Sequence, residues 1–272
     1  MTDTEKLKEL RLRILKAANI TKEGHIASAF SVLEIIYALY KHVLWYEPLK
    51  PDAEERDYFL LSKGHGAMAL YAVLGEMKFF DIELLNTYYQ KDSILGGHPD
   101  RLKVPGVEIS SGSLGHGLPI AVGLAMSLKR EGKKNRVFVL VGDGELNEGS
   151  NWEALMIAGA KSLDNLHIII DYNHSTDAAL DLYPLAGKLL GFRVDLRECD
   201  GHNIADIVDN LRTFKELPGM VCIGKPPIVV IANTVKGKGV RLIEQNPQMW
   251  HHRAPTDAEL EQFTQELTIE SP

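Results

Sequence analysis

The sequence predicts an α/β protein with a doubly wound, mostly parallel sheet and helices on both of its faces. From residue 106 onward, short apolar segments alternate with segments whose apolar residues recur at helical spacing, and the connections between them are short. The runs at 136–141 and 166–171 are largely apolar without alternation, as expected for parallel strands that helices cover on both sides. Strands and helices therefore alternate along most of the chain.

The individual elements follow from the same patterns. Helical spacing predicts helices at 5–20, 31–44, 65–77, 117–130, 150–161, 184–190 and 203–215. Short apolar or β-branched runs predict strands at 58–62, 136–141, 166–171, 192–199 and 226–235. Thr256 and Glu259 form a capping-box pattern, which predicts a terminal helix over about 256–268.

The composition favours an ordinary globular protein and excludes several classes. With 272 residues, 45% of them hydrophobic and 25% charged, and no internal repeat, the chain is expected to form one domain over 1–272. A net charge of -7 without clustered Lys or Arg makes a nucleic-acid surface unexpected. Cys199 and Cys222 are too few for a disulfide framework and form no CxxC pair, so a reducing, cytoplasmic location is expected. The start of the chain is charged and no apolar run approaches the ~20 residues of a membrane span, so no membrane is expected.

A glycine-flanked aspartate marks the candidate site. The predicted strand at 136–141 runs directly into Gly142, Asp143 and Gly144. In an open parallel sheet, ligands bind at the carboxyl ends of the strands, and the glycines allow the backbone to approach a bulky anion closely. A lone carboxylate there would repel a diphosphate, so a bridging cation is implied, and Mg²⁺ suits oxygen ligands that it shares with phosphates.

Asn173 lies thirty positions after Asp143, at the end of the next predicted strand. A helix between two parallel neighbouring strands takes about that length, so both side chains are expected at the same sheet edge. Taken alone, Gly-Asp-Gly also suits an ordinary turn, and Asn173 suits a turn residue. The loop patterns G-x-x-x-x-G-K-[ST] and G-x-G-x-x-G are absent from the sequence, which weakens nucleoside triphosphate and dinucleotide interpretations.

Several motifs together resemble the transketolase family. The stretch GDGELNEGSNWEALMIAGAKSLDNLHIIIDYN is similar to the thiamine diphosphate signature of that family. Further matching segments follow the family's order along residues ~5 to 257. They are Ser62-Lys63-Gly64-His65, Gly97-His98-Pro99-Asp100, Ser111 to Gly117, Val235 to Val240 and Asn246 to His252.

The resemblance implies a cofactor, a metal and a set of site residues. It implies thiamine diphosphate with Mg²⁺, or Ca²⁺ or Mn²⁺ in its place, held by Asp143, Asn173 and the main-chain carbonyl of Ser175. The implied cofactor-binding residues are His65, Gly112, Leu114, Gly142, Asp143, Gly144, Glu145, Asn173 and His251. The implied catalytic residues are His25, His65, His98 and His252, with His251 and His252 as alternatives for one family position. Imidazole suits this role because its unperturbed pKa lies near neutrality.

The resemblance covers the diphosphate-binding part of a transketolase and no more. Nothing in the chain matches the pyrimidine-binding domain of the family, its glutamate or the arginines that clamp a sugar phosphate. We therefore expect a split transketolase in which a second chain carries that domain, in an α2β2 assembly. The implied reaction is the transfer of a two-carbon ketol group from a ketose or ketose phosphate to an aldose.

Some positions depart from the family pattern. Residues 26–30 follow His25 where the family has smaller residues, His116 replaces a common glutamine, and the loop after Asn173 differs. We interpret these changes as signs of an unusual sugar substrate. Two other functions stay open at this point: the α-type chain of a 2-oxo acid dehydrogenase, which the flanking motifs disfavour, and a regulatory partner without catalysis.

Overall fold

The protein is built on a five-stranded sheet with the order β1-β2-β3-β5-β4, in which every neighbouring pair is parallel. The structure is a computed structural model, and it describes residues 1–177, 179–212 and 225–269. The strands are β1 (Tyr58–Leu61), β2 (Val137–Gly142), β3 (Leu166–Tyr172), β4 (Asp195–Asp200) and β5 (Ile228–Asn233). The predicted α/β class and a strand near each predicted position are confirmed.

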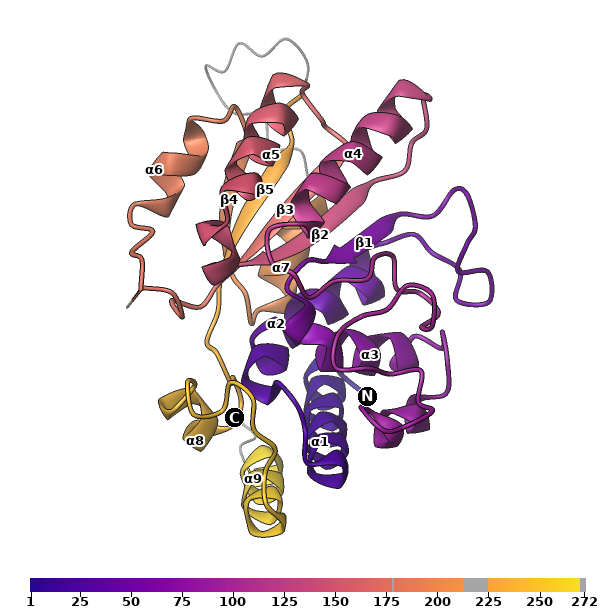
Figure 1. Cartoon of the computed structure of the whole chain (residues 1–272), viewed down its shortest axis with the longest axis vertical. Coiled ribbons are helices and arrows are strands. Elements are labelled where there is room, and N and C mark those ends of the chain that lie inside the picture. The colour runs from indigo at the N-terminus through magenta and orange to yellow at the C-terminus, as the bar shows by residue number, and fades with distance from the viewer. Residues whose placement is uncertain (178, 213–224, 270–272) are drawn as a thin grey trace.

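The strand order determines which face each crossover helix covers. From β1 through β2 and β3 to β4 the chain moves across the sheet in one direction, and from β4 to β5 it moves back. Because such crossovers are right-handed, the return connection must place its helix on the other face. Accordingly α4 (Gly117–Arg130), α5 (Gly149–Ala160) and α6 (Leu185–Leu190) cover one face (Figure 1), and α7 (Ile204–Arg212) covers the other.

Alternate side chains of each strand enter two separate cores. Val137, Val139 and Val141 of β2 pack under α4 and α5, whereas Phe138 and Leu140 point to the opposite core. The second core is the larger one and also contains α1 (Asp3–Thr21), α2 (Ile26–Ala38) and α3 (Ala67–Glu76). Both faces of the sheet are thus buried, as the apolar strands predict.

The remaining helices complete the molecule. Near the C-terminus, α8 (Arg241–Gln245) and α9 (Asp257–Ile269) gather with α1 at one end of the molecule (Figure 1). The described part also contains 3₁₀ turns at Gly64–Gly66, Ile82–Thr87 and Gly144–Asn147, and a π turn at Leu39–Val43. The sequence patterns did not predict α8 or these short turns.

The second helix differs from its prediction. It begins at Ile26 rather than at 31, because the side chains of 26–30 are small or apolar and all of them are buried in the core. By length and composition the segment Ile26–Val43 could cross a membrane, contrary to the expectation that no apolar run approaches that length. However, 89% of this segment is buried inside the structure, as in a core helix.

Near the fourth strand, one predicted boundary differs from the structure and one predicted helix extends beyond the described residues. The strand expected at 192–199 begins at Asp195, because Arg193 takes a positive φ of 56° that ends the preceding turn. The helix expected at 203–215 is described as far as Arg212, and its last three positions lie outside the described residues, as does Cys222. Cys199 is a free, buried thiol.

A buried histidine in β3 makes the fold sensitive to acid. His167 is 5% exposed and stacks on Phe138 with ring centroids 4.4 Å apart. Burial, and then the nearby Arg136 and Arg197, lower the pKa of His167 to about 3. An unfolded histidine titrates near its model value of 6.5, so the unfolded chain binds the extra proton first as the pH falls.

We therefore expect the unfolding free energy to decrease as the pH falls from 6.5 toward 3. In the variant His167→Leu this dependence should shrink by about 3 kcal/mol between pH 7 and pH 4. Urea unfolding at each pH measures the effect, and the exposed His116→Leu serves as the control. Equal pH dependence in both variants would contradict the assignment.

Candidate active site

A cavity of about 580 Å³ lies where the carboxyl ends of β1, β2, β3 and β5 meet. Its walls come from the segments that follow these strands, from the segment before α4 and from the loop after α8. It is lined by Lys63, His65, Leu114, Gly142, Asp143, Gly144, Glu145, Asn173, His174, Ser175, Lys236, Pro247, Gln248 and His251. The cavity lies at the sheet edge where the sequence places the candidate site.

Asp143 is held at the end of β2 with its carboxylate inside this cavity. Its backbone N–H donates to the carbonyl of Asp171 at 3.1 Å, which extends the β2–β3 ladder by one residue. One carboxylate oxygen accepts hydrogen bonds from the N–H of Gly144 at 2.7 Å and the hydroxyl of Ser175 at 3.0 Å. The other oxygen accepts the N–H of Ser175 at 2.9 Å.

Asn173 reaches the same place from the end of β3. Its amide NH₂ donates to the hydroxyl of Ser31 at 3.0 Å and to the carboxylate of Asp171 at 2.9 Å. These bonds turn the amide oxygen toward Ser175, whose N–H it accepts at 3.1 Å. The three residues expected to hold a metal, Asp143, Asn173 and Ser175, are therefore brought together.

The donor atoms at this point fit a hard divalent cation. They are carboxylate and amide oxygens beside a main-chain turn, which are the ligands that Mg²⁺ prefers. At Ser175 the recorded contacts run through the N–H and the hydroxyl, whereas the sequence pointed to the carbonyl. Within the described ranges, no group of three or more His, Cys, Asp or Glu side chains is arranged to hold a metal.

Asp171 is a buried acid that connects four segments below the cavity floor. It is 0% exposed and is contacted by Lys63, Ser31, Thr234 and Asn173. Burial alone would raise the pKa of Asp171, but the ammonium of Lys63 and the surrounding hydroxyl donors hold the pKa below its usual value. Asp171 therefore stays ionised, and it fixes both Lys63 and the orientation of Asn173.

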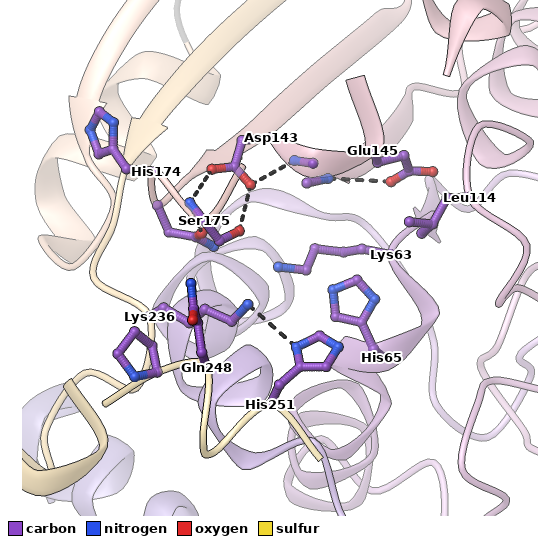
Figure 2. Close-up of a pocket in the computed structure, with 14 residues that line it drawn as sticks. Lys63, His65, Leu114, Asp143, Glu145, His174, Ser175, Lys236, Gln248 and His251 are labelled. Atoms are coloured by element: carbon purple, nitrogen blue, oxygen red, sulfur yellow. Dashed lines mark hydrogen bonds between the residues drawn. The ribbon is translucent and has the colours of Figure 1, made fainter. Parts of the chain in front are cut away.

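Two lysines point into the cavity (Figure 2), and sequence reasoning had assigned no role to them. Lys63 pairs with Asp171, while the ammonium of Lys236 lies 3.4 Å from Nδ1 of His251. Burial, and then the positive charge of Lys63, lower the pKa of Lys236. Both lysines follow directly on strands, β1 and β5, and this position could have identified them. Together they give the cavity a cationic wall suited to phosphate groups.

The candidate histidines form one cluster of rings around His25. The ring of His25 lies 6.0 Å from the rings of both His65 and His98, 5.2 Å from His251 and 4.6 Å from His252. His65 and His251 line the cavity. His25, His98 and His252 do not line it, and the Nε2 of His252 lies 3.1 Å from the carboxylate of Glu23.

Burial keeps the inner histidines neutral. It lowers the pKa of His25 to about 4 and that of His65 to about 2, with the positive charge of Lys63 adding to the effect at His65. The Nδ1 of His25 lies 2.7 Å from the main-chain carbonyl of His251, so Nδ1 must carry the proton and Nε2 is left as an acceptor. His25 therefore offers a proton acceptor at neutral pH.

The glycine-rich segment before α4 is held by other residues of the site. The N–H of Gly115 donates to Glu145 at 2.9 Å, and that of Gly117 to the hydroxyl of Ser62 at 3.1 Å. The first N–H group is thus bonded to a carboxylate of the chain itself and the second to a hydroxyl. Gly112 packs against the ring of His98, since a Cβ there would lie 3.2 Å from it. Leu114 lines the cavity.

Glu145 is turned toward the same segment. Its carboxylate is 1% exposed and also accepts hydrogen bonds from Ser62 and, at 3.3 Å, from the N–H of Gly142. Burial raises the pKa of Glu145, although these donors act in the opposite direction. The carboxylate of Glu145 thus connects the residue after β1, the segment before α4 and the end of β2.

The departures from the family pattern have different structural outcomes. Residues 26–30 point into the core and none of them lines the cavity, so they change the packing of α2 rather than narrow the pocket. The loop after Asn173, by contrast, contributes His174 and Ser175 to the cavity wall. His174, which the sequence did not distinguish, pairs with Asp177 at 2.9 Å.

The chain resembles known proteins along its whole length. A family model described as the transketolase thiamine diphosphate binding domain matches residues 2–271. One subunit of the apulose-4-phosphate transketolase of Actinobacillus succinogenes is 43% identical over 98% of this chain and 96% of its own. A 6-deoxy-6-sulfo-D-fructose transketolase subunit of a Clostridium species is 37% identical over 81% of this chain and 80% of its own.

The solved structures agree with the sequence comparisons. The transketolase of Leishmania mexicana superposes with a TM-score of 0.82 and 25% identity over 98% of this chain. The chain spans 41% of the length of that transketolase. These findings confirm the resemblance drawn from the motifs. The chain belongs to the transketolase family and is a thiamine diphosphate-binding domain of the kind that forms one of the subunits in two-chain transketolases.

Proposed function

We propose that the protein transfers a two-carbon ketol group from a ketose or ketose phosphate to an aldose, as the cofactor-binding subunit of a two-chain enzyme. The observation that carries this proposal is the convergence of Asp143, Asn173 and Ser175 with two lysines in one cavity. The second chain would carry the pyrimidine-binding domain, and the assembly would be α2β2. The names of the relatives, which are subunits of transketolases, support this arrangement.

In this proposal each part of the cavity has a chemical task. Asp143, Asn173 and Ser175 would hold Mg²⁺, or Ca²⁺ or Mn²⁺ in its place, against the diphosphate. Lys63 and Lys236 would offset the remaining phosphate charge, and Gly142 and Gly144 would let the main chain approach the phosphates. Bound thiamine diphosphate supplies the carbon nucleophile for ketol transfer.

The histidine cluster would bind the sugar and move its protons. His25 and His65 are neutral at physiological pH, so they can accept hydrogen bonds from sugar hydroxyls without repelling the lysines. The Nε2 of His25 is placed to take a proton from a substrate hydroxyl. His98 and His252 would contact the outer part of the substrate, because they lie beside His25 and outside the cavity lining.

The substrate is proposed to be a less common sugar. The two named relatives act on apulose 4-phosphate and 6-deoxy-6-sulfofructose, which supports this proposal. Membership of the transketolase family favours ketol transfer over 2-oxo acid decarboxylation. Asp143 and Asn173 both contact the N–H of Ser175, and this convergence of two possible metal ligands favours catalysis over a purely regulatory role.

The proposed function predicts that activity needs both chains. The purified chain with thiamine diphosphate and Mg²⁺ should show no ketol transfer, and addition of the second transketolase chain from the same organism should restore it. Both points are tested by coupled assays of ketol transfer with apulose 4-phosphate, 6-deoxy-6-sulfofructose and xylulose 5-phosphate as donors. Full activity of the chain alone would contradict the split arrangement, and turnover of xylulose 5-phosphate at the rate of an ordinary transketolase would contradict the unusual substrate.

The variant Asp171→Asn should weaken metal binding without touching a metal ligand. An amide at this position can donate as well as accept, so the NH₂ of Asn173 loses its fixed acceptor and the amide oxygen loses its orientation. We expect the Mg²⁺ affinity of the thiamine diphosphate complex to fall roughly 10- to 100-fold, as for other outer partners of metal ligands. Calorimetric Mg²⁺ titration of the two-chain complex measures it.

The matched control for this loss of a buried carboxylate is Asp195→Asn. Asp195 is buried like Asp171 but pairs with Arg197 in β4. A melting curve of each variant separates misfolding from a local effect. Equal Mg²⁺ affinity in the wild type and in Asp171→Asn would refute the positioning role.

The variant Lys236→Met should weaken the binding of the diphosphate selectively. The structure records no ion pair for Lys236 in the ranges it describes, so an anion is its natural partner. The affinity of the complex for thiamine diphosphate should fall roughly tenfold or more, while that for thiamine without phosphate should stay the same. Fluorescence titration with both compounds checks this, and an equal loss for both would place Lys236 away from the diphosphate.

A further inference from the structure

The turn that carries Lys236 lies between two cavities. We call residues 235–239 the Lys236 turn. Lys236 lines the cavity of the candidate active site (Figure 2), whereas Lys238 and Gly239 line a second cavity of about 540 Å³. Val235, at the start of the turn, is 40% exposed. Because open space borders the turn on two sides, its position depends strongly on hydrogen bonds to its main chain.

Two side chains from other parts of the fold hold the main chain of this turn, one on each side of Lys236. Before Lys236, the N–H of Val235 donates to Nε2 of His202 at 2.8 Å. After it, the Nε of Arg11 donates to the carbonyl of Lys238 at 2.9 Å. His202 lies in the loop between β4 and α7, and Arg11 belongs to α1. The turn is thus anchored to two separate elements.

Glu34 of α2 joins these two anchors. One of its carboxylate oxygens accepts a hydrogen bond from Arg11, and the other lies 3.2 Å from Nδ1 of His202. The side chains of all three residues are at most 10% exposed. Burial alone would raise the pKa of Glu34, but the guanidinium of Arg11 and the imidazole of His202 hold the pKa below its usual value. Glu34 is therefore an ionised carboxylate inside the protein, and its charge attracts both partners.

This carboxylate also determines which nitrogen of His202 can accept. A ring nitrogen that accepts the N–H of Val235 carries no proton, so the proton of the neutral ring is on Nδ1. The contact between Nδ1 and Glu34 lacks the alignment of a hydrogen bond, and neither atom has such a partner in the described ranges. The negative charge of Glu34 nevertheless favours the proton on Nδ1. Glu34 thereby keeps Nε2 free to accept the N–H of the turn.

Gly239 provides independent evidence for this arrangement. Its φ is +96°, in the left-handed region that favours glycine, and a Cβ there would lie 2.9 Å from Nε of Arg11. Another residue at this position would be strained and would push away the guanidinium that holds the carbonyl of Lys238. The last glycine of the Val-Lys-Gly-Lys-Gly motif is thus explained by the close approach of Arg11.

We propose that Arg11, Glu34 and His202 position Lys236 toward the diphosphate, an inference that rests on the proposed function. A lysine side chain is long and flexible, so its ammonium reaches a defined point only if the main chain that carries it is fixed. The three residues line the second cavity and none of them lines the active-site cavity. They are therefore positioning residues, which act on the bound diphosphate through Lys236.

The variant His202→Ala should weaken diphosphate binding. Without an acceptor for its first N–H the Lys236 turn loses one anchor, so the affinity of the two-chain complex for thiamine diphosphate with Mg²⁺ should fall roughly fivefold. The affinity for thiamine without phosphate should stay the same. His202→Gln retains an acceptor oxygen and should recover most of the loss. Fluorescence titration with both compounds measures these affinities.

The matched control is His42→Ala. His42 also contacts a carboxylate, that of Asp3 at 2.8 Å, but it lines neither of the two cavities. This variant should bind thiamine diphosphate and thiamine as the wild type does. A melting curve of each variant separates misfolding from a local effect.

A double variant tests whether His202 acts through Lys236. In the Lys236→Met complex the ammonium is already absent, so adding His202→Ala should change the affinity for thiamine diphosphate by less than about twofold. A further loss of roughly fivefold in this background would show that the two effects are independent. That result would overturn the positioning role.

The outcomes separate this inference from the proposed function. If the wild-type complex transfers ketol groups but His202→Ala binds thiamine diphosphate as well as His42→Ala does, the positioning role is wrong and the function stands. An equal loss for thiamine diphosphate and for thiamine would also overturn the positioning role. If the wild-type complex binds the cofactor but transfers no ketol group, the proposed function fails, and the double variant still decides the role of His202. If the wild-type complex binds no thiamine diphosphate, both are wrong.

Discussion

The buried contact between Asp171 and Lys63 is the interaction on which the site depends. A carboxylate and an ammonium are both removed from water, and each is tolerated there only because the other is present. The same carboxylate receives hydroxyl groups from α2 and from the end of β5 and the amide of Asn173. The ends of β1, β3 and β5 are thereby held at fixed positions relative to α2. The cavity floor is rigid because one acid satisfies donors from four segments.

The contacts of Asp171 also determine how charge is distributed around the cavity. Asp171 pairs with Lys63. The second cation, Lys236, therefore faces the cavity beside neutral histidines. Asp143 stands opposite, with its oxygens taken up by Ser175 and Gly144. The result is a pocket with a cationic wall, the acids Asp143 and Glu145 in its lining and the uncharged proton acceptors His65 and, beside it, His25. An anion bridged to a divalent cation matches this distribution of charge.

Much of this arrangement could be predicted from the sequence, and the exceptions have physical reasons. The apolar strands and the spacing of Asp143 and Asn173 predicted the sheet and the metal candidates, because chain geometry alone brings consecutive parallel strands to one edge. Lys63 and Lys236 were assigned no role from the sequence, although each lies within three residues of the end of a strand. The early start of α2 was missed because burial, rather than periodicity, makes residues 26–30 helical. The partners of Glu145 depend on loops whose paths no local pattern determines.

The three partners of Glu145 have a consequence for how this sequence can change. Two segments that are far apart in the chain, the glycine-rich segment before α4 and the Gly-Asp-Gly turn, each donate an N–H group to this carboxylate. The serine after β1 donates its hydroxyl to the same carboxylate. A substitution in one of these segments therefore alters the energetic cost of a substitution in another. The motifs behave as a single mutational unit, and their effects in combination will not be the sum of their effects taken singly.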